Sequence, residues 1–396
     1  MLSNVAAAVL LAPLLSSVAN AFPPSYGGSG KNSVGKAIYI LGNDADNTVI
    51  SLPIKSDGTV SHGSKTSTGG QGSNIATNGD TAMSQAPDSL GSQGAVAVSG
   101  KYVFAVNAGS NSLSMFEAYD ERDSSKLRLL GKPAHLPGEF PVTVGASEKH
   151  QLACVGFSGA KAGVSCVPYS GRGLGHADAL RPFDLGQTTP PNSTLNLVGS
   201  TIFSGNEDYV YTTVRGTNGF LSSFPVEFFG KVSEKGARPI TNFKRTLFGA
   251  ESLPGTDKVV VADTVIGADI LTVDHQKASI EEVTISGQKA TCWVTASEKT
   301  GSGYATDAGV NRLVEFDLDS GKIIKILNLN NGNPGMFDAA VAGNYIYALY
   351  AGNGTLPGTV TVFDTKGQKG YLKQVQVYNL EGMGVTPNAI GMAVMA

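Results

Sequence analysis

Three side chains of this sequence are the best candidates for chemistry, namely Arg215, Glu251 and Asp338. Arg215 follows the predicted strand residues Tyr211–Val214, and its guanidinium can bind an enolate, a carboxylate or a tropolone oxygen pair through paired hydrogen bonds. Glu251 and Asp338 can act as general acid or base if partial burial raises their pKa values. Structural roles stay open for all three: a salt bridge for the arginine, and hydrogen bonds to loop amides for the acids.

A second group of residues is suited to binding rather than to proton transfer. Its members lie at or near the ends of short apolar runs, where side chains project from strands into loops. They are Gln93, Asn107, Phe140, Trp293, Phe337 and Asn388. A pocket with such a mixed polar and aromatic lining suits a small molecule better than a polymer.

Signatures of nucleotide, metal and hydrolase chemistry are missing from the sequence. Gly30–Lys36 spells G-x-x-x-x-G-K, but Ala37 stands where magnesium binding requires a Ser or Thr. The five histidines lack the spacing of metal ligands, and no G-x-S-x-G elbow occurs. We therefore expect no metal and no other cofactor.

The three cysteines indicate one disulfide. Cys154 and Cys166 flank a short polar stretch, and a hairpin folded about Ala160 places them opposite each other on neighbouring strands. At a non-hydrogen-bonded pair the Cα atoms approach to about 4.5–5.5 Å, which a disulfide can bridge. Cys292, next to Trp293, is then unpaired, and we expect it to be a buried core thiol.

The first residues predict the secretory pathway. Val5–Leu15 is an uncharged apolar run, followed by small residues that end at Ala21, so residues 1–21 have the pattern of a signal peptide. The mature chain would begin at Phe22 and be secreted, which agrees with the predicted disulfide. Two sequons begin at Asn192 and Asn353, both beside turn residues, and both are candidate glycosylation sites.

Composition narrows the class of partner. The 29 basic and 32 acidic residues leave a formal charge of −3, and charged residues make up 15% of the chain. This balance offers no basic surface for nucleic acid or for an anionic membrane, so we expect small-molecule substrates and neither of those partners. The sequence does not predict an oligomeric state.

The elements that must position these residues follow an internal repeat. Seven times, an apolar strand is followed by a polar turn rich in Gly, Asn or Asp and then by a second, alternating strand. Equivalent positions recur every 43 to 65 residues, close to the length of a four-stranded propeller blade. The equivalent residues are Tyr39, Phe104, Cys154, Tyr211, Val260, Tyr304 and Tyr347.

The two ends of the repeat array predict how it closes. A shorter strand precedes most units but not the first, and a strand of the same character, 387–394, has no hairpin after it. If this last segment supplies the inner strand of the first blade, no exposed sheet edge is left at the junction. We therefore predict an all-β fold: a single seven-bladed β-propeller domain over 22–396, closed by the carboxyl-terminal strand. A large β-sandwich is the alternative.

Several segments together resemble the secreted fungal 3-carboxymuconate cyclase-like family, within the lactonase-type seven-bladed propellers. The segments that carry the resemblance are 93–100, 106–114, 138–142, 192–194, 199–203 and Arg215-Gly216. Members with lactonising activity use a His, an Arg and a Glu around the mouth of the channel. Of that set, we place only Arg215 in this sequence.

The resemblance implies three functions to compare. The wider group looks like it includes hetero-Diels–Alderases of tropolonic sesquiterpenoid biosynthesis, which join a quinone methide to a terpene alkene and need only binding and hydrogen bonds. That ring-forming reaction is our first expectation. A lactonase or carboxymuconate-type cycloisomerase is the second, favoured if Arg215 shares a cavity with a His and a Glu. A non-catalytic secreted glycoprotein antigen is the third, favoured if side chains plug the channel.

Overall fold

A computed structural model describes residues 34–76, 88–216, 219–240 and 245–396 of the chain. The predicted signal peptide, residues 1–21, and the start of the mature chain at Phe22 lie outside these residues. Among the described residues, no helix is long and apolar enough to cross a membrane.

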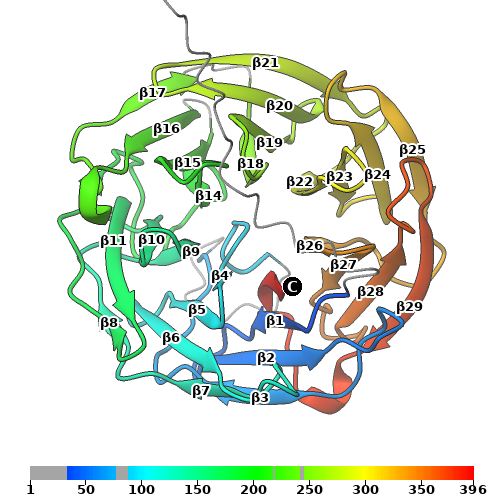
Figure 1. The fold of residues 1–396 in the computed structure, drawn as a ribbon, viewed down its shortest axis with the longest axis horizontal. Coiled ribbons are helices and arrows are strands. Elements are labelled where there is room, and N and C mark those ends of the chain that lie inside the picture. The colour runs from blue at the N-terminus through cyan, green and yellow to red at the C-terminus, as the bar shows by residue number, and fades with distance from the viewer. Residues whose placement is uncertain (1–33, 77–87, 217–218, 241–244) are drawn as a thin grey trace, which may run out of the picture. The chain divides into compact units, whose positions relative to one another are not determined.

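Strands dominate the described residues and form seven antiparallel sheets arranged around a ring (Figure 1). We number the sheets as blades 1 to 7 in chain order and give their strands from the centre outward. Blade 1 contains β30 (Ile390–Met395), β1 (Ala37–Leu41), β2 (Thr48–Pro53) and β3 (Ser64–Ser67). Blade 2 contains β4 (Val96–Ser99), β5 (Tyr102–Asn107), β6 (Ser112–Ala118) and β7 (Leu127–Leu129), with β8 (Ala134–His135) also on β6. Blade 3 contains β9 (Pro141–Ser147), β10 (Leu152–Phe157), β11 (Gly163–Ser170) and β12 (Gly173–Leu174), with β13 (Arg181–Pro182) also on β11.

The remaining four blades each have four strands. Blade 4 contains β14 (Leu197–Phe203), β15 (Tyr209–Arg215), β16 (Phe220–Pro225) and β17 (Ala237–Ile240). Blade 5 contains β18 (Leu247–Ser252), β19 (Lys258–Asp263), β20 (Gly267–Asp274) and β21 (Lys277–Thr284). Blade 6 contains β22 (Thr291–Ser297), β23 (Ser302–Asp307), β24 (Arg312–Asp317) and β25 (Ile323–Asn328). Blade 7 contains β26 (Phe337–Ala342), β27 (Tyr345–Tyr350), β28 (Thr359–Asp364) and β29 (Lys373–Asn379), and two short 3-10 turns, η2 (Phe228–Gly230) and η3 (Glu381–Met383), lie in connections.

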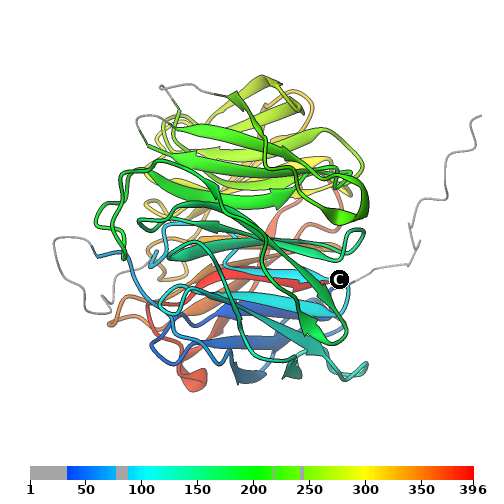
Figure 2. The ribbon, with the colours of Figure 1, turned by 90° about the vertical axis from the view of Figure 1, so that its left-hand side faces the viewer.

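The burial of each strand explains its sequence pattern. Middle strands such as β10 are buried along their whole length, because blades pack against both faces, so they appear as continuous apolar runs. Figure 2 shows this stacking of successive blades from the side. Outer strands such as β29 alternate exposed and partly buried residues, because only one face meets protein.

The predicted all-β seven-bladed propeller is confirmed, including its closure. β30 pairs with β1 along Ala37–Leu41 and also contacts the inner strands β26 and β4 of the neighbouring blades. The predicted disulfide between Cys154 and Cys166 is also confirmed, between directly opposed residues of β10 and β11. Cys292 is a free thiol, as expected, but it is partly buried against the core and not fully buried within it.

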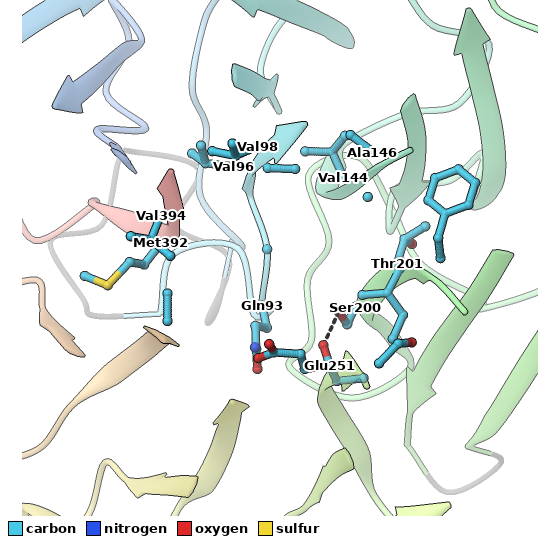
Figure 3. Close-up of a pocket in the computed structure, with 18 of the residues that line it drawn as sticks. Gln93, Val96, Val98, Val144, Ala146, Ser200, Thr201, Glu251, Met392 and Val394 are labelled. Carbon is cyan, nitrogen blue, oxygen red and sulfur yellow. Dashed lines mark hydrogen bonds between the residues drawn. The ribbon is translucent and has the colours of Figure 1, made fainter. Parts of the chain in front are cut away.

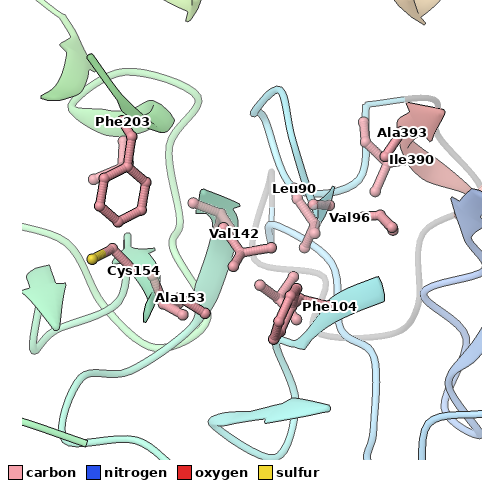
Figure 4. Close-up of a cluster of buried hydrophobic side chains, with 14 of the residues drawn as sticks. Leu90, Val96, Phe104, Val142, Ala153, Cys154, Phe203, Ile390 and Ala393 are labelled. Carbon is pink, nitrogen blue, oxygen red and sulfur yellow. The ribbon is translucent and has the colours of Figure 1, made fainter. Parts of the chain in front are cut away.

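The largest apolar core runs between the blades rather than through one of them. Figure 4 shows part of it, where Val96, Phe104, Val142 and Phe203 come from blades 2, 3 and 4. Ile390 of β30 joins the same cluster from blade 1. The last strand therefore shares a core with segments hundreds of residues earlier in the chain.

Candidate functional site

A cavity of about 420 Å³ lies among the inner strands at the centre of the ring. Its lining comes from β30, β4, β9, β14, β18 and β26, and it extends past the strand ends to Glu207 and Pro254. We call it the central cavity. The side of the ring at which the inner strands begin is called the amino face, and the side at which they end is the carboxyl face. The cavity extends from Gln93 and Glu251 toward the carboxyl face.

The central cavity has two unlike walls (Figure 3). Aliphatic side chains from β30, β4 and β9 form an apolar wall, namely Val96, Val98, Val144, Met392 and Val394. Opposite them, β14, β18 and the segment before β4 present Gln93, Ser200, Thr201, Glu251 and Ser252. A ligand with one apolar and one polar side would satisfy both walls.

Glu251 is the acid of this cavity. It lies in β18 opposite Val260 of β19 and is partly exposed to the cavity. Burial raises the pKa of Glu251 to about 7, although the Thr295 hydroxyl and the Ala296 amide lower it. Near neutral pH this carboxyl can therefore both accept and donate a proton.

Asp338 lies near Glu251 but is enclosed by backbone amides. Its side chain is 1% exposed and accepts hydrogen bonds from the N–H groups of Gly94 (3.3 Å), Met392 (2.9 Å) and Ala339 (2.8 Å). Burial raises the pKa of Asp338 to about 7, and its charge in turn raises the pKa of Glu251. Asp338 thus joins blades 7, 1 and 2 and does not itself line the central cavity.

Gln93 and Ser92 occupy the amino-face end of the channel. The Gln93 amide donates to the Val294 carbonyl (2.7 Å) and accepts from the Val294 N–H (3.1 Å), which links it to blade 6. The Gln93 N–H donates to Gly199 of blade 4 (2.7 Å), and the Ser92 hydroxyl donates to Val142 of blade 3 (2.7 Å). These bonds hold the segment across the ring, so the central cavity is bounded at this end.

Arg215 lies outside the central cavity. It is 7% exposed, and its guanidinium stacks over the Phe248 ring at 4.5 Å. Among the described residues, its Nε and Nη2 atoms have no hydrogen-bond partner. Burial lowers the pKa of Arg215, and the nearby Asp88 opposes that effect. None of the five histidines is among the residues that line the cavity, so Arg215, a His and a Glu do not share one cavity in the described residues.

The aromatic binding candidates pack at the amino face. Trp293 is 1% exposed and makes edge contacts with Phe248 (5.3 Å) and Phe337 (5.0 Å), and its indole N–H donates to the Ser92 carbonyl (3.1 Å). Phe140 is also buried, and its own N–H donates to the Asn111 side chain (2.8 Å). These rings stabilise the blade junctions and are not in the lining of the central cavity.

The two amide candidates, Asn107 and Asn388, form hydrogen bonds with other side chains of the protein. Asn107 accepts from Asn47 (2.9 Å) and Thr68 (2.6 Å), and it donates to Ser112 (3.1 Å) and Ser114 (2.9 Å). Asn388 accepts from Asn74 (2.7 Å) and donates to Asp44 (2.9 Å). Of the predicted site residues, the structure therefore brings only Gln93 and Glu251 to the central cavity.

Most of the cavity lining lies outside the predicted positions. Most predicted residues lie in or near turns at the amino face, whereas the cavity is lined by residues inside the inner strands and by the β14–β15 turn that contains Glu207. Strand alternation would not have found these residues, because the lining includes consecutive residues of the inner strands, such as Val96–Val98 and Val144–Ala146. In the described residues no group of three or more His, Cys, Asp or Glu side chains is placed to hold a metal ion.

Comparisons with known proteins identify the fold. The chain matches no protein-family model and no curated protein. It is similar to the structure of a periplasmic gluconolactonase, PpgL, from Pseudomonas aeruginosa, with 13% identity, a TM-score of 0.64, and coverage of 91% of this chain and 99% of that one. Proposed 6-phosphogluconolactonases from Bacteroides uniformis and Bacteroides fragilis give TM-scores of 0.61 and 0.62 at 12% and 10% identity, with 91% and 93% of this chain and 99% and 100% of theirs covered. At these identities the likeness shows a shared fold and nothing about activity.

Proposed function

We propose that the protein is an enzyme that opens or closes a lactone ring in the central cavity, with Glu251 as its acid-base group. The observation that carries this proposal is the position of Glu251, a partly exposed residue in the cavity lining whose pKa of about 7 suits proton transfer in both directions. The fold supports it, because similar structures include a gluconolactonase and proposed 6-phosphogluconolactonases.

In the hydrolytic direction, water opens the lactone ring. The Glu251 carboxylate takes a proton from water as the water oxygen bonds to the lactone carbonyl carbon and the carbonyl electron pair moves onto oxygen. When that pair returns, the ring C–O bond breaks, and the departing ring oxygen takes the proton from Glu251. The Ser200 hydroxyl makes only a 3.5 Å contact with the Ala250 carbonyl, so it can turn to donate to the substrate's carbonyl oxygen. The product is a hydroxy acid.

The variant Glu251→Gln tests this role. It keeps the shape of the side chain but removes the proton transfer, so we expect turnover of a δ-lactone to fall by about 10²- to 10⁴-fold while binding persists. The wild-type rate should rise with pH through about 7, because only the ionised carboxyl can accept the proton. Titration of the released acid at constant pH measures both effects.

The matched control is Glu281→Gln on the exposed outer strand of the same blade, which should leave turnover unchanged. Unchanged turnover in Glu251→Gln itself would contradict the proposal.

A hetero-Diels–Alder reaction between a tropolone-derived quinone methide and a terpene alkene is the second candidate. The apolar wall favours it, because it can hold an alkene while the protonated Glu251 donates a hydrogen bond to the quinone methide oxygen. Glu251→Gln retains an N–H donor, so adduct formation should survive this substitution although lactone turnover does not. The rate should also fall, not rise, as pH increases through about 7.

We also infer secretion and glycosylation at Asn192 and Asn353. The Cys154–Cys166 disulfide supports an oxidising compartment, and both asparagines are exposed. A gel mobility shift after enzymatic deglycosylation, absent when both are changed to Gln, tests this. The hydrogen bonds that Gln93 and Ser92 make across the amino-face end of the channel favour the third candidate, a non-catalytic secreted glycoprotein. The turnover assays above test that candidate directly.

A further inference from the structure

The charged side chains among the described residues that line the central cavity are all acidic. Glu251 lies within it and Glu207 at its carboxyl-face rim, and no Lys, Arg or His is among the described residues that line it. Lys149, which contacts the turn that contains Glu207, already bonds to Asp208 (2.8 Å) and to the Asn206 carbonyl (2.9 Å). An anionic ligand would meet carboxylates without a compensating cation, which costs affinity and slows association.

Glu207 is held in its position at the rim. Its backbone lies in the left-handed region (φ 64°), its carboxylate accepts a hydrogen bond from the Ser147 hydroxyl, and its carbonyl oxygen contacts the His150 ring nitrogen at 3.0 Å. These contacts join the β14–β15 turn to blade 3. The negative charge of Glu207 is therefore fixed beside the path into the cavity.

The apolar wall favours ligands that carry an alkyl group over ligands that carry hydroxyl groups on that side. Val98 and Val394 are partly exposed, and together with Val96, Val144 and Met392 they face the polar side chains of blades 4 and 5 (Figure 3). A hydroxyl placed against this wall would give up its hydrogen bonds with water and find no partner, whereas an alkyl group would be removed from water at no such cost. Polyhydroxylated ligands fit only one side of the cavity.

We propose that the central cavity takes an uncharged lactone bearing an aliphatic substituent, and that it discriminates against sugar lactones and against phosphorylated or carboxylated lactones. The inference rests on the proposed function for its reaction but concerns the choice of substrate. The ring carbonyl would face Glu251 and Ser200, and the alkyl group would lie on β30, β4 and β9. Glu207 would be the residue that excludes anions.

The first experiment compares three probes on the wild-type protein. We expect kcat/KM for δ-decalactone to exceed that for glucono-δ-lactone by at least about tenfold, as for a few methylenes in an apolar pocket, and to exceed that for its 6-phosphate by more. Equal or faster turnover of either sugar lactone would overturn the inference while leaving the proposed lactone reaction intact.

Two variants and a control test the apolar wall and the rim separately. Val98→Thr changes one methyl of the apolar wall to a hydroxyl and should lower the preference for δ-decalactone over glucono-δ-lactone several-fold. Val375→Thr, on the exposed strand β29, should leave that preference unchanged. Glu207→Gln should raise the ratio of 6-phosphate to δ-decalactone turnover several-fold. No change of either ratio in the corresponding variant would refute the assigned wall or rim.

Calorimetric measurement of ligand binding distinguishes a wrong reaction from a wrong class of ligand. If δ-decalactone binds and is not hydrolysed, the lactone reaction is wrong and the choice of an uncharged, alkyl-bearing ligand stands. If no probe binds, or the 6-phosphate binds as tightly as δ-decalactone, the inference is wrong.

Discussion

At the scale of single residues, two buried arginines differ in the hydrogen bonds that their guanidinium groups make. Arg181 donates to the Ser233 (2.7 Å) and Val232 (2.6 Å) carbonyls and forms an ion pair with Asp178 (2.8 Å). Arg215, with similar burial, makes no such bonds at Nε and Nη2 to the residues that the structure describes, and it stacks on Phe248. Removing a buried, fully bonded cation leaves several groups unpaired, whereas removing an unbonded one leaves few.

We therefore expect Arg181→Met to lower the free energy of unfolding by about 3 kcal/mol or more, and Arg215→Met by less than about 1 kcal/mol. Urea unfolding of both variants measures the difference. Equal losses would mean that Arg215 is stabilised by its surroundings as strongly as Arg181. The same Arg215→Met protein, assayed with the lactone probes, tests the catalytic role that we predicted for Arg215, since retained turnover would exclude it.

At the scale of elements, β30 is the strand on which the ring depends. It pairs with β1, and its Met392 N–H donates to Asp338 of blade 7. The Lys36 N–H continues the pairing with a bond to the Met395 carbonyl (2.6 Å). Without β30, blade 1 would lose its inner strand, and the edges of β1 and the core side of β4 would meet water.

A chain that ends at Thr386 should therefore lose cooperative unfolding, because blade 1 can no longer close against blades 7 and 2. Fluorescence of Trp293, the single tryptophan, reports on the amino-face core during urea unfolding. Deletion of the exposed Ala396 alone is the control and should have no effect. Adding a peptide of residues 387–396 should restore part of the lost stability. An unchanged transition in the shortened chain would show that closure does not depend on β30.

At the scale of the whole molecule, buried carboxyls couple the fold to pH. Burial raises the pKa of Asp88 to about 6 and those of Glu251, Asp269 and Asp338 to about 7. In the unfolded chain such groups titrate near 4, so between about pH 4 and pH 7 the folded state binds protons that the unfolded state has lost. By linkage, stability is then greatest at the acidic end of this window and falls as pH rises through it.

We accordingly expect the midpoint of urea unfolding to be lower at pH 8 than at pH 5, with little further change above about pH 8. Glu251→Gln should flatten this dependence, because one of the four carboxyls with raised pKa values is gone. Below about pH 4 the trend should reverse slightly, since hydrogen bonds from Lys369 and Ser320 hold the pKa of the partly exposed Asp317 below its usual range. A midpoint that rises between pH 5 and pH 8 would contradict the argument.

The sequence by itself determined the seven-bladed ring, its closure by the last strand and the disulfide, because these depend on local alternation, turn residues and the spacing of a repeat. Hairpin partners lie within about a dozen residues of each other, so their pairing can be followed along the chain. The unpaired first and last strands then leave one arrangement in which no edge stays open.

Only the tertiary structure decided where the cavity lies and which acid faces it. Gln93 meets Val294 across the ring, 201 residues apart in sequence, and that contact bounds the channel at the amino face, where we expected ligands to bind. Glu251 and Asp338 are alike as sequence candidates, and packing alone exposes the first to the cavity and encloses the second in backbone amides. Long-range packing of this kind has no local signature, because it depends on which side chains of seven separate blades meet at the axis.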